Sequence, residues 1–407
     1  MTRITLLGAC GAVGSVAAGI LASSGDFDEM VLCDLNLRKI KNIAKSLNKS
    51  NISARSFDAD NMESIKNVIK GSDVVLNCVG PFYKYGPRIL RAAIETKVNY
   101  VDVCDDFDAT VSMLKMDKAA KKVGISALIG MGSSPGMANV IVRFCADNLF
   151  DKVESVDIYH AHGGEKVEGP AVVKHRIHSM EADIPMFLNG KFTTIRLFEK
   201  SGKALEEVTD FKNVGKYRVY GYPHPETITL PRYLKGVKRV TNLGLVLPPA
   251  YAELIKGMVR LGVTSAKPII VQGVKVNPLE FAVAFILSQR ARLTREAGLT
   301  EAQGCLKIVV KGKKNGAKNT YIFQMTSKGK GMGEGTGIPA ALGAILMGSK
   351  KITVKGVLPP EACVNPMDVI NLIKTKIKFE DDKKRGGVPI DITHIDKEGK
   401  ETEIKLF

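Results

Sequence analysis

The sequence has no Cys-x-x-Cys pair, no internal repeat and no low-complexity tract, and beyond residue 22 it has no run of 18 uncharged apolar residues. The missing cysteine spacing argues against a zinc finger or a dithiol redox centre, and the missing apolar run argues against a membrane-spanning helix. The seven cysteines are odd in number, and several stand in apolar stretches, where a free thiol behaves as a small buried hydrophobic group. We therefore expect a protein of the reducing cytoplasm.

The apolar stretch 4–22 follows Arg3 and superficially resembles a secretory signal peptide. It is rich in glycine, however, and a second strand-like segment with a terminal Asp follows it directly. A nucleotide-binding strand–turn–helix accounts for all of these features, whereas a signal peptide accounts only for the apolar character. We therefore expect this stretch to be part of the fold.

Positive charge is present in excess: 59 Lys and Arg residues against 42 Asp and Glu give a formal charge of +17. Such an excess is compatible with nucleic acid, a membrane surface or anionic small molecules as partners. The basic residues are spread along the whole chain, and no recognition helix, zinc finger or aromatic stacking motif accompanies them. We expect no nucleic-acid partner and interpret the charge as a surface property that favours encounters with anionic cofactors and substrates.

The first 150 residues alternate short apolar segments with amphipathic ones. Almost continuously apolar, β-branched segments, typical of strands buried on both faces, lie at 3–8, 29–34, 52–58, 73–78, 99–103 and 126–130. Helical patterns lie between them, at 12–24, 37–48, 62–70, 86–96, 109–122 and 136–148. This rhythm predicts an α/β fold, a doubly wound parallel sheet of the Rossmann type.

After residue 151 strands outnumber helices, which predicts a second α+β domain with a mixed sheet. We expect strands at 153–160 and 270–276, a helix near 172–181, and a hairpin of 306–311 with 319–325 across the turn at 313–316. A glycine-rich segment at 331–348 enters a short helix of small residues. Residues 390–407 form a further hairpin pattern.

A glycine-rich turn follows the first predicted strand and opens the first predicted helix. Its sequence is Gly8-Ala9-Cys10-Gly11-Ala12-Val13-Gly14, a G-x-x-G-x-x-G variant of the dinucleotide fingerprint. Glycines permit a tight turn and close approach of the backbone to a pyrophosphate, which the N-terminus of the helix attracts. The motif predicts that Gly8, Gly11, Ala12, Val13 and Gly14 bind a dinucleotide.

Acidic residues at strand ends indicate which nucleotide binds. Asp34 ends the second predicted strand 20 residues after Gly14, where a carboxylate accepts hydrogen bonds from the adenosine ribose. This favours NAD; NADP stays open because Arg38 could partly offset the repulsion of a 2′-phosphate. Asp58, after the third strand, is either a partner of the adenine amino group or an exposed loop acid.

Ligands of doubly wound sheets bind beyond the carboxyl ends of the strands. This rule nominates residues 80–82, Asp102 and residues 131–134 as walls of the reaction site, with Gly80 and Pro81 beneath the nicotinamide.

Several motifs resemble one family. The dinucleotide-binding domain of the saccharopine dehydrogenase-like oxidoreductases is similar to this chain at Gly80-Pro81-Phe82, Tyr85-Gly86 and Asn99-Tyr100-Val101-Asp102. The loop 132–137 resembles the family's G-x-D-P-G-M loop, with Ser134 in place of the Asp. The segment 224–231 is similar to the H-x-E-x-x-T-L-P segment of the lysine 6-dehydrogenase and carboxynorspermidine synthase-like branch, and 335–341 and 356–361 match the family's late segment.

The resemblance implies a domain organisation. It suggests a dinucleotide-binding domain at 1–150 and a substrate-binding and dimerisation domain at 151–330. A segment at 331–375 then returns to the first domain, and a C-terminal hairpin occupies 376–407. A homodimer is implied as well.

The resemblance also implies an NAD(P)-dependent oxidoreductase acting on a C–N bond of an amino-acid or polyamine-type substrate. Lysine 6-dehydrogenase-like oxidation and reductive condensation of a semialdehyde with an amine are both compatible with it. Such chemistry needs a proton relay, for which His224 is the first candidate because imidazole titrates near neutral pH. Glu226 would orient His224 or bind the amine, and Asp102 is the second candidate, although it could simply cap the following helix.

Two alternatives remain open. A nucleotide-sensing regulator could keep the fold without catalysis, an interpretation that Ser134 favours. A metal site is conceivable because His160 and His162 share one strand face and His175 and His178 share one helix face. No Cys or carboxylate joins them at ligand spacing in the sequence, so we predict no metal.

Overall fold

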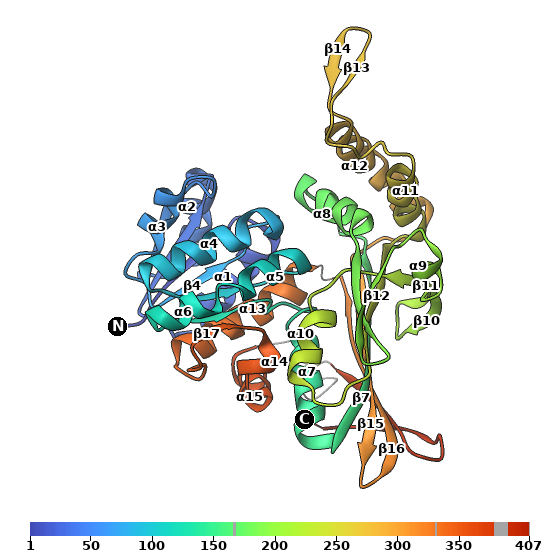
Figure 1. Ribbon diagram of the computed structural model, residues 1–407. Helices are drawn as coiled ribbons and strands as arrows, with labels where there is room; N and C mark the ends of the chain where they lie inside the picture. The colour runs from blue at the N-terminus through green and yellow to red at the C-terminus, as the bar shows by residue number, and fades with distance from the viewer. Residues whose placement is uncertain (166–167, 330–331, 378–389, 407) are drawn as a thin grey trace.

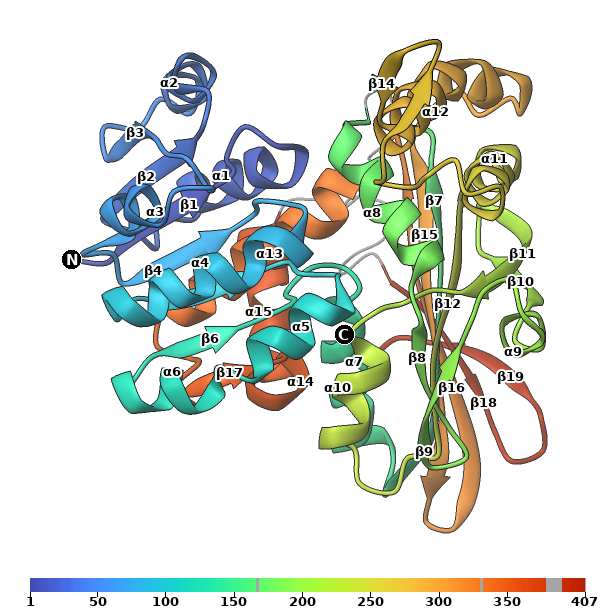
Figure 2. The same ribbon diagram turned by 45° about the horizontal axis from the view of Figure 1, so that its top comes forward.

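The computed structural model describes residues 1–165, 168–329, 332–377 and 390–406. Two large β-sheets organise the molecule, each within its own lobe, and Figures 1 and 2 show the two lobes side by side from two directions. The N-terminal, blue to cyan part of the chain builds one lobe, and the green to orange part builds the other.

The first lobe is a parallel sheet of the predicted Rossmann type. Its seven strands have the order β17-β6-β5-β4-β1-β2-β3. They are β1 (Arg3–Leu7), β2 (Glu29–Asp34), β3 (Ile52–Ser56), β4 (Val74–Asn77), β5 (Asn99–Asp102), β6 (Ser126–Leu128) and β17 (Gly356–Leu358). Apart from the edge strand β3, whose residues are half-buried or exposed, the strand interiors are almost wholly buried, as their continuous apolar sequence predicts. The predicted doubly wound α/β sheet is confirmed.

Helices α1 to α6 connect the first six strands, and α7 leads from β6 to the second lobe. They are α1 (Ala12–Ser24), α2 (Leu37–Ser46), α3 (Met62–Ile69), α4 (Phe82–Thr96), α5 (Phe107–Leu114), α6 (Asp117–Val123) and α7 (Met137–Phe144), and α7 continues as the π-helical turn η1 (Cys145–Leu149). The prediction of one helix over 109–122 is wrong. Helix α5 ends at Leu114, and a separate helix, α6, begins at Asp117 after the N-cap residue Met116. Oδ1 of Asp117 accepts a hydrogen bond from the Val357 amide of the edge strand β17 at 3.0 Å.

A late segment joins the first lobe. Helix α13 (Met332–Gly348) packs along α1, and glycines make this approach possible, because a Cβ at Gly333 or Gly337 would lie 2.8 Å from the carbonyl oxygens of Ala12 or Val13. After α13, β17 extends the sheet, followed by α14 (Pro360–Cys363) and α15 (Pro366–Lys376). Figure 1 shows these orange-red elements against the blue lobe.

The second lobe is a ten-stranded mixed sheet, as predicted. Its main path is β10-β11-β12-β7-β15-β16-β18-β19, with β8 and β9 attached to β12. The strands are β7 (Lys152–Gly163), β8 (Ile184–Leu188), β9 (Lys191–Ile195), β10 (Glu207–Phe211), β11 (Gly215–Gly221), β12 (Arg239–Leu247), β15 (Gln303–Lys314), β16 (Ala317–Lys328), β18 (Asp391–Ile395) and β19 (Glu401–Ile404). Both predicted hairpins, β15–β16 and β18–β19, are confirmed, and the second one continues the large sheet by pairing β18 with β16.

Helices cover parts of this sheet: α8 (Pro170–Glu181), α9 (Lys200–Lys203), α10 (Glu226–Tyr233), α11 (Pro249–Arg260) and α12 (Pro278–Glu296). The predicted single strand over 270–276 is wrong, because the chain forms a separate hairpin of β13 (Ile269–Val271) and β14 (Val274–Val276). Gln272 and Gly273 have φ values of 49° and 80°, which the two central residues of a tight hairpin turn require. No helix among the described residues is both long and apolar enough to cross a membrane.

Candidate functional site

The glycine-rich turn between β1 and α1 has the close packing that its sequence predicts. Gly8 has φ +81°, and a Cβ there would lie 2.8 Å from the carbonyl oxygen of Cys78 at the end of β4. A Cβ on Gly14 would overlap the Gly8 carbonyl oxygen. Gly11 is exposed and stands directly before α1, so the N-terminal amides of that helix point out of the turn. This cradle fits a pyrophosphate.

Two acidic residues end the neighbouring strands. Asp34 Oδ2 accepts from the Cys10 amide at 3.0 Å, so this carboxylate also holds the glycine-rich turn against β2. Asp58 follows β3 and accepts from the Asp60 amide at 2.8 Å, as an exposed loop acid does. Both residues lie at the carboxyl edge of the sheet, on the side of the turn where the adenosine half of a dinucleotide belongs.

A cavity of about 870 Å³ extends from the glycine-rich turn to the second lobe. This volume lies within the range of small-molecule sites. The first lobe lines it with Gly11, Ala12, Val13, Gly80, Pro81 and Phe82, and the second lobe lines it with His160, His162, His175, Arg176, Tyr222 and His224. The structure therefore brings the predicted nicotinamide end and His224 to one cavity.

His224 stands just before α10 and is buried in a group of rings. Its Nδ1 lies 3.4 Å from Oε2 of Glu226. The rings of His160 and Tyr222 lie with their centroids 5.3 Å from that of His224, the first stacked and the second edge-on. Gly244 on β12 makes room for this group, because a Cβ there would overlap the His160 ring. Sequence analysis considered His160 only as a possible metal ligand; its place beside His224 was missed because it lies on β7, some sixty residues earlier in the chain.

Glu226 is fully buried beneath His224. Its Oε1 accepts from the hydroxyl of Ser134, and that hydroxyl accepts from Asn242 Nδ2 at 3.4 Å. Ser134 stands in the loop before α7, so this chain of polar groups joins the first lobe to β12 and α10. The residue that departs from the family's pattern is thus in direct contact with the predicted catalytic Glu226.

Buried polar atoms without hydrogen-bond partners are found at this wall of the cavity and directly behind it. Among the described residues, the buried atoms without a hydrogen-bond partner include His160 Nε2, His224 Nδ1, Glu226 Oε2 and Asn242 Oδ1. Buried polar groups without partners are rare, and a concentration of them marks a place where a ligand or ordered water completes the network.

Burial also determines the charge of the neighbouring rings. Desolvation, followed by the nearby rings of His224 and His162, holds the pKa of His160 well below its usual value. Desolvation and the positive charge of Arg176 lower the pKa of His162 to about 4. Both rings are therefore neutral at pH 7 and can accept a proton or a hydrogen bond.

Asp102, the second predicted catalytic residue, lies elsewhere. It is fully buried, Oδ1 accepts from the amides of Gly130 and Cys104 at 2.7 and 3.0 Å, and Oδ2 accepts from the Tyr100 hydroxyl at 2.8 Å. Burial raises its pKa to about 6, although these donors oppose the shift. Asp102 is not among the residues that line the cavity. The structure therefore does not bring it together with His224, and its contacts fix the chain after β5 and β6.

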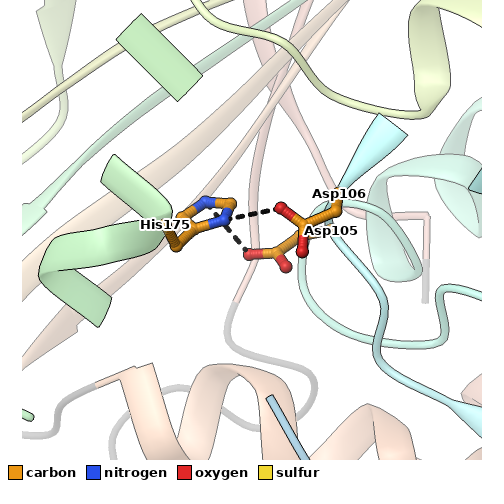
Figure 3. Close-up of side chains that lie close together, drawn as sticks. All are labelled: Asp105, Asp106 and His175. Atoms are coloured by element: carbon orange, nitrogen blue, oxygen red, sulfur yellow. Dashed lines mark hydrogen bonds and ion pairs between the residues drawn. The ribbon is translucent and has the colours of Figure 1, made fainter. Parts of the chain in front are cut away.

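A second polar cluster at the cavity joins the two lobes, and the sequence analysis did not predict it. Figure 3 shows His175 of α8 between Asp105 and Asp106, which follow β5. His175 Nδ1 lies 2.8 Å from Asp106 Oδ1, and His175 Nε2 lies 3.6 Å from Asp105 Oδ2. Burial alone would lower the pKa of His175, but the two carboxylates outweigh it and raise this pKa to about 9. Ligands of such sheets bind beyond the carboxyl ends of the strands, and Asp105 and Asp106 follow the end of β5 just as closely as the nominated Asp102. Extending the same rule by three residues would have identified this pair.

The atoms of these three side chains that could ligate a metal ion lie within 4.8 Å of one another. In the folded protein a pair of carboxylates therefore does lie beside one of the four histidines considered as metal ligands in the sequence analysis. In the structure they satisfy each other as a cation and two anions. The absence of a metal stays a prediction. Arg176, the next residue of α8, also lines the cavity and forms a buried ion pair with Glu168, which also pairs with Arg290 Nε at 3.1 Å.

Comparisons with known proteins agree with this geometry. Residues 4–128 match the family model of the saccharopine dehydrogenase NADP binding domain, and residues 132–378 match that of the saccharopine dehydrogenase C-terminal domain. The chain is 24% identical to the carboxyaminopropylagmatine dehydrogenase of Synechocystis sp. over 89% of its own length and 92% of that protein. It is also 24% identical to the carboxynorspermidine synthase of Vibrio cholerae, over 77% and 79% of the two chains.

Among solved structures, the saccharopine dehydrogenase (L-Glu forming) of Saccharomyces cerevisiae has the same fold. The match covers 100% of both chains, with a TM-score of 0.65 and 15% identity. The two family models together span the Rossmann lobe and most of the second lobe, including the glycine-rich turn and the His224 group. The chain therefore belongs to the saccharopine dehydrogenase family and is an NAD(P)-dependent oxidoreductase.

Proposed function

We propose that this enzyme forms or breaks the C–N bond of a polyamine-type or amino-acid-derived amine, with reductive condensation of a semialdehyde and an amine as the favoured direction. The observation that carries the proposal is the cavity that runs without interruption from the Gly11–Val13 end of the turn to His224. The names of two relatives, a carboxynorspermidine synthase and a carboxyaminopropylagmatine dehydrogenase, support a substrate of the polyamine type.

NAD(P), when bound, supplies or accepts a hydride at its nicotinamide ring. The pyrophosphate fits the turn at Gly11 and the N-terminus of α1, and residues 80–82 form the wall next to the nicotinamide. In this arrangement the first lobe does no proton chemistry. Its task is to hold the nicotinamide face toward the second lobe, which places the reacting carbon within reach of His224.

His224 is the proposed proton relay. In the condensation direction a neutral amine attacks the aldehyde carbon, the resulting carbinolamine loses its protonated hydroxyl as water to give a protonated imine, and the carbon of the protonated imine then receives the hydride to give the neutral secondary amine. The amine must first lose a proton and the departing hydroxyl must gain one. Glu226 faces Nδ1 of His224, which leaves Nε2 as the ring atom that takes and returns this proton. The same steps in reverse oxidise an amine to an imine that water opens.

Glu226 is the proposed positioning residue. Its buried carboxylate faces Nδ1 of His224 and orients the ring, and the Ser134 hydroxyl holds one carboxylate oxygen in place. The neutral rings of His160 and His162 extend the proton-accepting surface of the wall. We propose Asp102 as a structural residue rather than a catalytic one, because each of its oxygens already accepts a hydrogen bond from a neighbouring backbone or Tyr100.

We propose NAD as the preferred nucleotide, with Gly8, Gly11, Ala12, Val13, Gly14, Asp34, Asp58, Gly80 and Pro81 as its contacts. The support is Asp34, a carboxylate that would repel a 2′-phosphate at the end of β2. The matching family domain is described as NADP-binding, so both nucleotides belong in the test.

The remaining assignments are proposals of the same kind. We propose a cytoplasmic homodimer with a dinucleotide-binding domain at 1–150, a substrate-binding domain at 151–330, a return segment at 331–375 and a C-terminal hairpin at 376–407. Part of the last segment, residues 378–389, lies outside the described residues.

A screen tests the proposed function. Semialdehydes are paired with diamines and amino acids, and reduced-nucleotide consumption is followed with NADH and with NADPH; single amines with NAD and NADP test the reverse reaction. We expect turnover with at least one polyamine-type pair and a preference for NADH. Tight nucleotide binding without turnover of any pair or amine would contradict the proposal.

A further inference from the structure

Hydride transfer requires the nicotinamide and the reacting carbon to lie about 3–3.5 Å apart, and a misplacement of about 1 Å can cost about 100-fold in rate. With the nicotinamide beside residues 80–82, the two reactants rest on walls that belong to different lobes. Residues 80–82 come from the first lobe, whereas α8 and His224 come from the second. Contacts that join the lobes at the cavity therefore set the distance between the reactants.

Asp106 is connected to both walls. It follows β5, lines the cavity, and has a side chain that is only 2% exposed. Its Oδ2 accepts from the Tyr83 amide at 2.8 Å, and its Oδ1 lies 2.8 Å from Nδ1 of His175, as Figure 3 shows for the histidine. Tyr83 directly follows Phe82 in the first turn of α4, where helix amides have no partner within the helix. One carboxylate thus anchors the start of the helix behind the nicotinamide wall and holds a side chain of α8.

His175 is the second-lobe end of this contact. Helix α8 packs into the core of the second lobe through Val173 and Ile177, which are almost fully buried. His175 and Arg176 of the same helix line the cavity. The contact of His175 with Asp106 therefore fixes where α8, as part of the substrate wall, stands relative to the first lobe.

Charge strengthens the contact. Both ring nitrogens of His175 face carboxylates, since Nε2 lies 3.6 Å from Oδ2 of Asp105, and a protonated imidazole has an N–H donor for each. Burial opposes the ionisation of Asp106, but the hydrogen bond and the positive charge of His175 outweigh it and lower the pKa of Asp106. Hydrogen bonds between ionised groups are shorter and stronger than those between neutral groups. The two lobes are thus held together here by a charge-assisted bond.

A neighbouring contact of α8 serves as a comparison. Nε2 of His178, three residues further along the helix, lies 3.2 Å from Oδ2 of Asp108, and the His178 ring lies 4.8 Å from the Tyr83 ring. The His178 side chain is 36% exposed and is not among the described residues that line the cavity. Asp108 accepts from the amide of Ala109 in its own helix. This pair joins the same two segments without reaching the backbone at the nicotinamide wall.

We propose that Asp106 and His175 are positioning residues for hydride transfer, which hold the nicotinamide wall and the substrate wall at the distance that the reaction requires. The inference rests on the proposed place of the nicotinamide beside residues 80–82, and it assigns no proton transfer to either residue. Without the His175 ring, Asp106 stays bonded to the Tyr83 amide, so the nicotinamide wall keeps its shape while α8 is released. The nucleotide then binds normally, but the reacting carbon is no longer held against it.

The experiment is a single-turnover measurement, in which stopped-flow absorbance follows the reduced nucleotide with a substrate pair from the screen. The amplitude counts the competent molecules, and the rate constant reports the hydride step, which a slower rate with nucleotide deuterated at C4 verifies. His175→Ala removes the ring. His175→Asn returns an N–H donor near the position of Nδ1. His178→Ala, which removes the neighbouring histidine of the same helix, is the matched control.

We expect His175→Ala to lower the rate constant roughly 10- to 100-fold, with the amplitude and the nucleotide dissociation constant unchanged. His175→Asn should restore most of the rate constant, and His178→Ala should match the wild type. A lower amplitude at the wild-type rate constant would give His175 a structural role only and overturn the inference. An equal loss of rate in His178→Ala, or no recovery in His175→Asn, would overturn it as well.

A second measurement separates this inference from the proposed function. If no substrate in the screen is turned over, the proposed function fails, and hydrogen–deuterium exchange of the NADH complexes decides the inference instead. Faster exchange at 170–181 in His175→Ala than in the wild type and His178→Ala, with exchange at 80–86 unaltered, supports it. Exchange at 170–181 that is the same in all three proteins contradicts it.

Discussion

The wall of the cavity beside the glycine-rich turn is built largely from backbone and from residues adjacent in sequence, whereas the wall around His224 is built from side chains of distant segments. Three glycines within seven residues form the first wall, and their steric requirements are met between β1 and α1. His160, His224 and Ser134 line the second, and Glu226 and Asn242 support it from behind; these residues come from β7, the segment before α10, the loop before α7, α10 and β12. The first wall can be recognised from a motif; the second exists only once the chain is folded.

This difference predicts which substitutions affect binding and which affect turnover. A change in the backbone-built wall displaces the cofactor, since nothing else can take over the shape of the turn. A change in the side-chain wall leaves the cofactor in place and alters proton transfer. The following predictions test this separation, in order of decreasing effect.

His224→Asn tests the side-chain wall and has the largest expected effect. Loss of a positioned acid–base group lowers turnover by about 10²- to 10⁴-fold. The dissociation constant of NAD(P)H stays as in the wild type, because His224 lies on the wall opposite the turn. Steady-state kinetics and a fluorescence titration measure the two quantities. His394→Asn, which replaces a histidine bonded to Asn319 in the hairpin sheet, is the control. Unchanged turnover in His224→Asn would mean that another group relays the proton.

Gly14→Ala tests the backbone wall. The added Cβ overlaps the Gly8 carbonyl oxygen, and relief of this overlap distorts the turn at a cost of about 1–3 kcal/mol, or roughly 5- to 150-fold in nucleotide affinity. Gly19→Ala makes the same chemical change on the same helix, where nothing lies within 4 Å of the added atom, and it should leave the affinity unaltered. Equal affinities for the two variants would remove the steric explanation of the turn.

Ser134→Ala tests how the second wall is supported. Without the hydroxyl donor, one oxygen of the buried Glu226 loses its hydrogen bond, at a cost of about 1–2 kcal/mol, and we expect turnover at pH 7 to fall roughly 5- to 30-fold. Ser46→Ala, which removes an exposed hydroxyl that bonds within α2, is the control for a lost hydroxyl. Turnover of Ser134→Ala equal to that of the wild type would show that this hydroxyl does not support Glu226.

His175→Asn tests the polar contact that joins the two lobes. The pKa of His175 is raised to about 9 in the folded protein, so its stabilising charge is fully present below about pH 6.5, its ordinary value, and is lost as the pH rises through 9. Urea unfolding should show the variant less stable than the wild type at pH 6, with the difference shrinking toward pH 10. A difference that does not depend on pH would show that the proton on His175 contributes nothing to this contact.

Prediction from sequence was successful where structure follows from local pattern. The six N-terminal strands, the glycine-rich turn and the β15–β16 hairpin each depend on neighbouring residues or on one tight turn. The same reliance on pattern failed at 270–276, where continuous apolar character concealed the turn at Gln272 and Gly273, and at 109–122, where the helix breaks at Met116.

The candidate site was predictable only in part, for a related reason. His224 and Glu226 were found because they lie two residues apart in one motif, and the structure places them 3.4 Å apart. The contact of Ser134 with Glu226 and the packing of His160 against His224 bridge long stretches of chain, so no local pattern encodes them. Asp102 satisfied the strand-end rule as well as Asp105 does, but only the folded chain shows which carboxylate faces the cavity.

The most direct test of the account follows the hydride between the two walls. With an amine substrate found in the screen and deuterated at the carbon that bears the nitrogen, the nicotinamide recovered after oxidation is examined by mass spectrometry and NMR. The account predicts one deuterium at C4 of the nicotinamide per product formed, in the wild type and in the residual turnover of His224→Asn. Product formed while the nicotinamide carries no deuterium would contradict it.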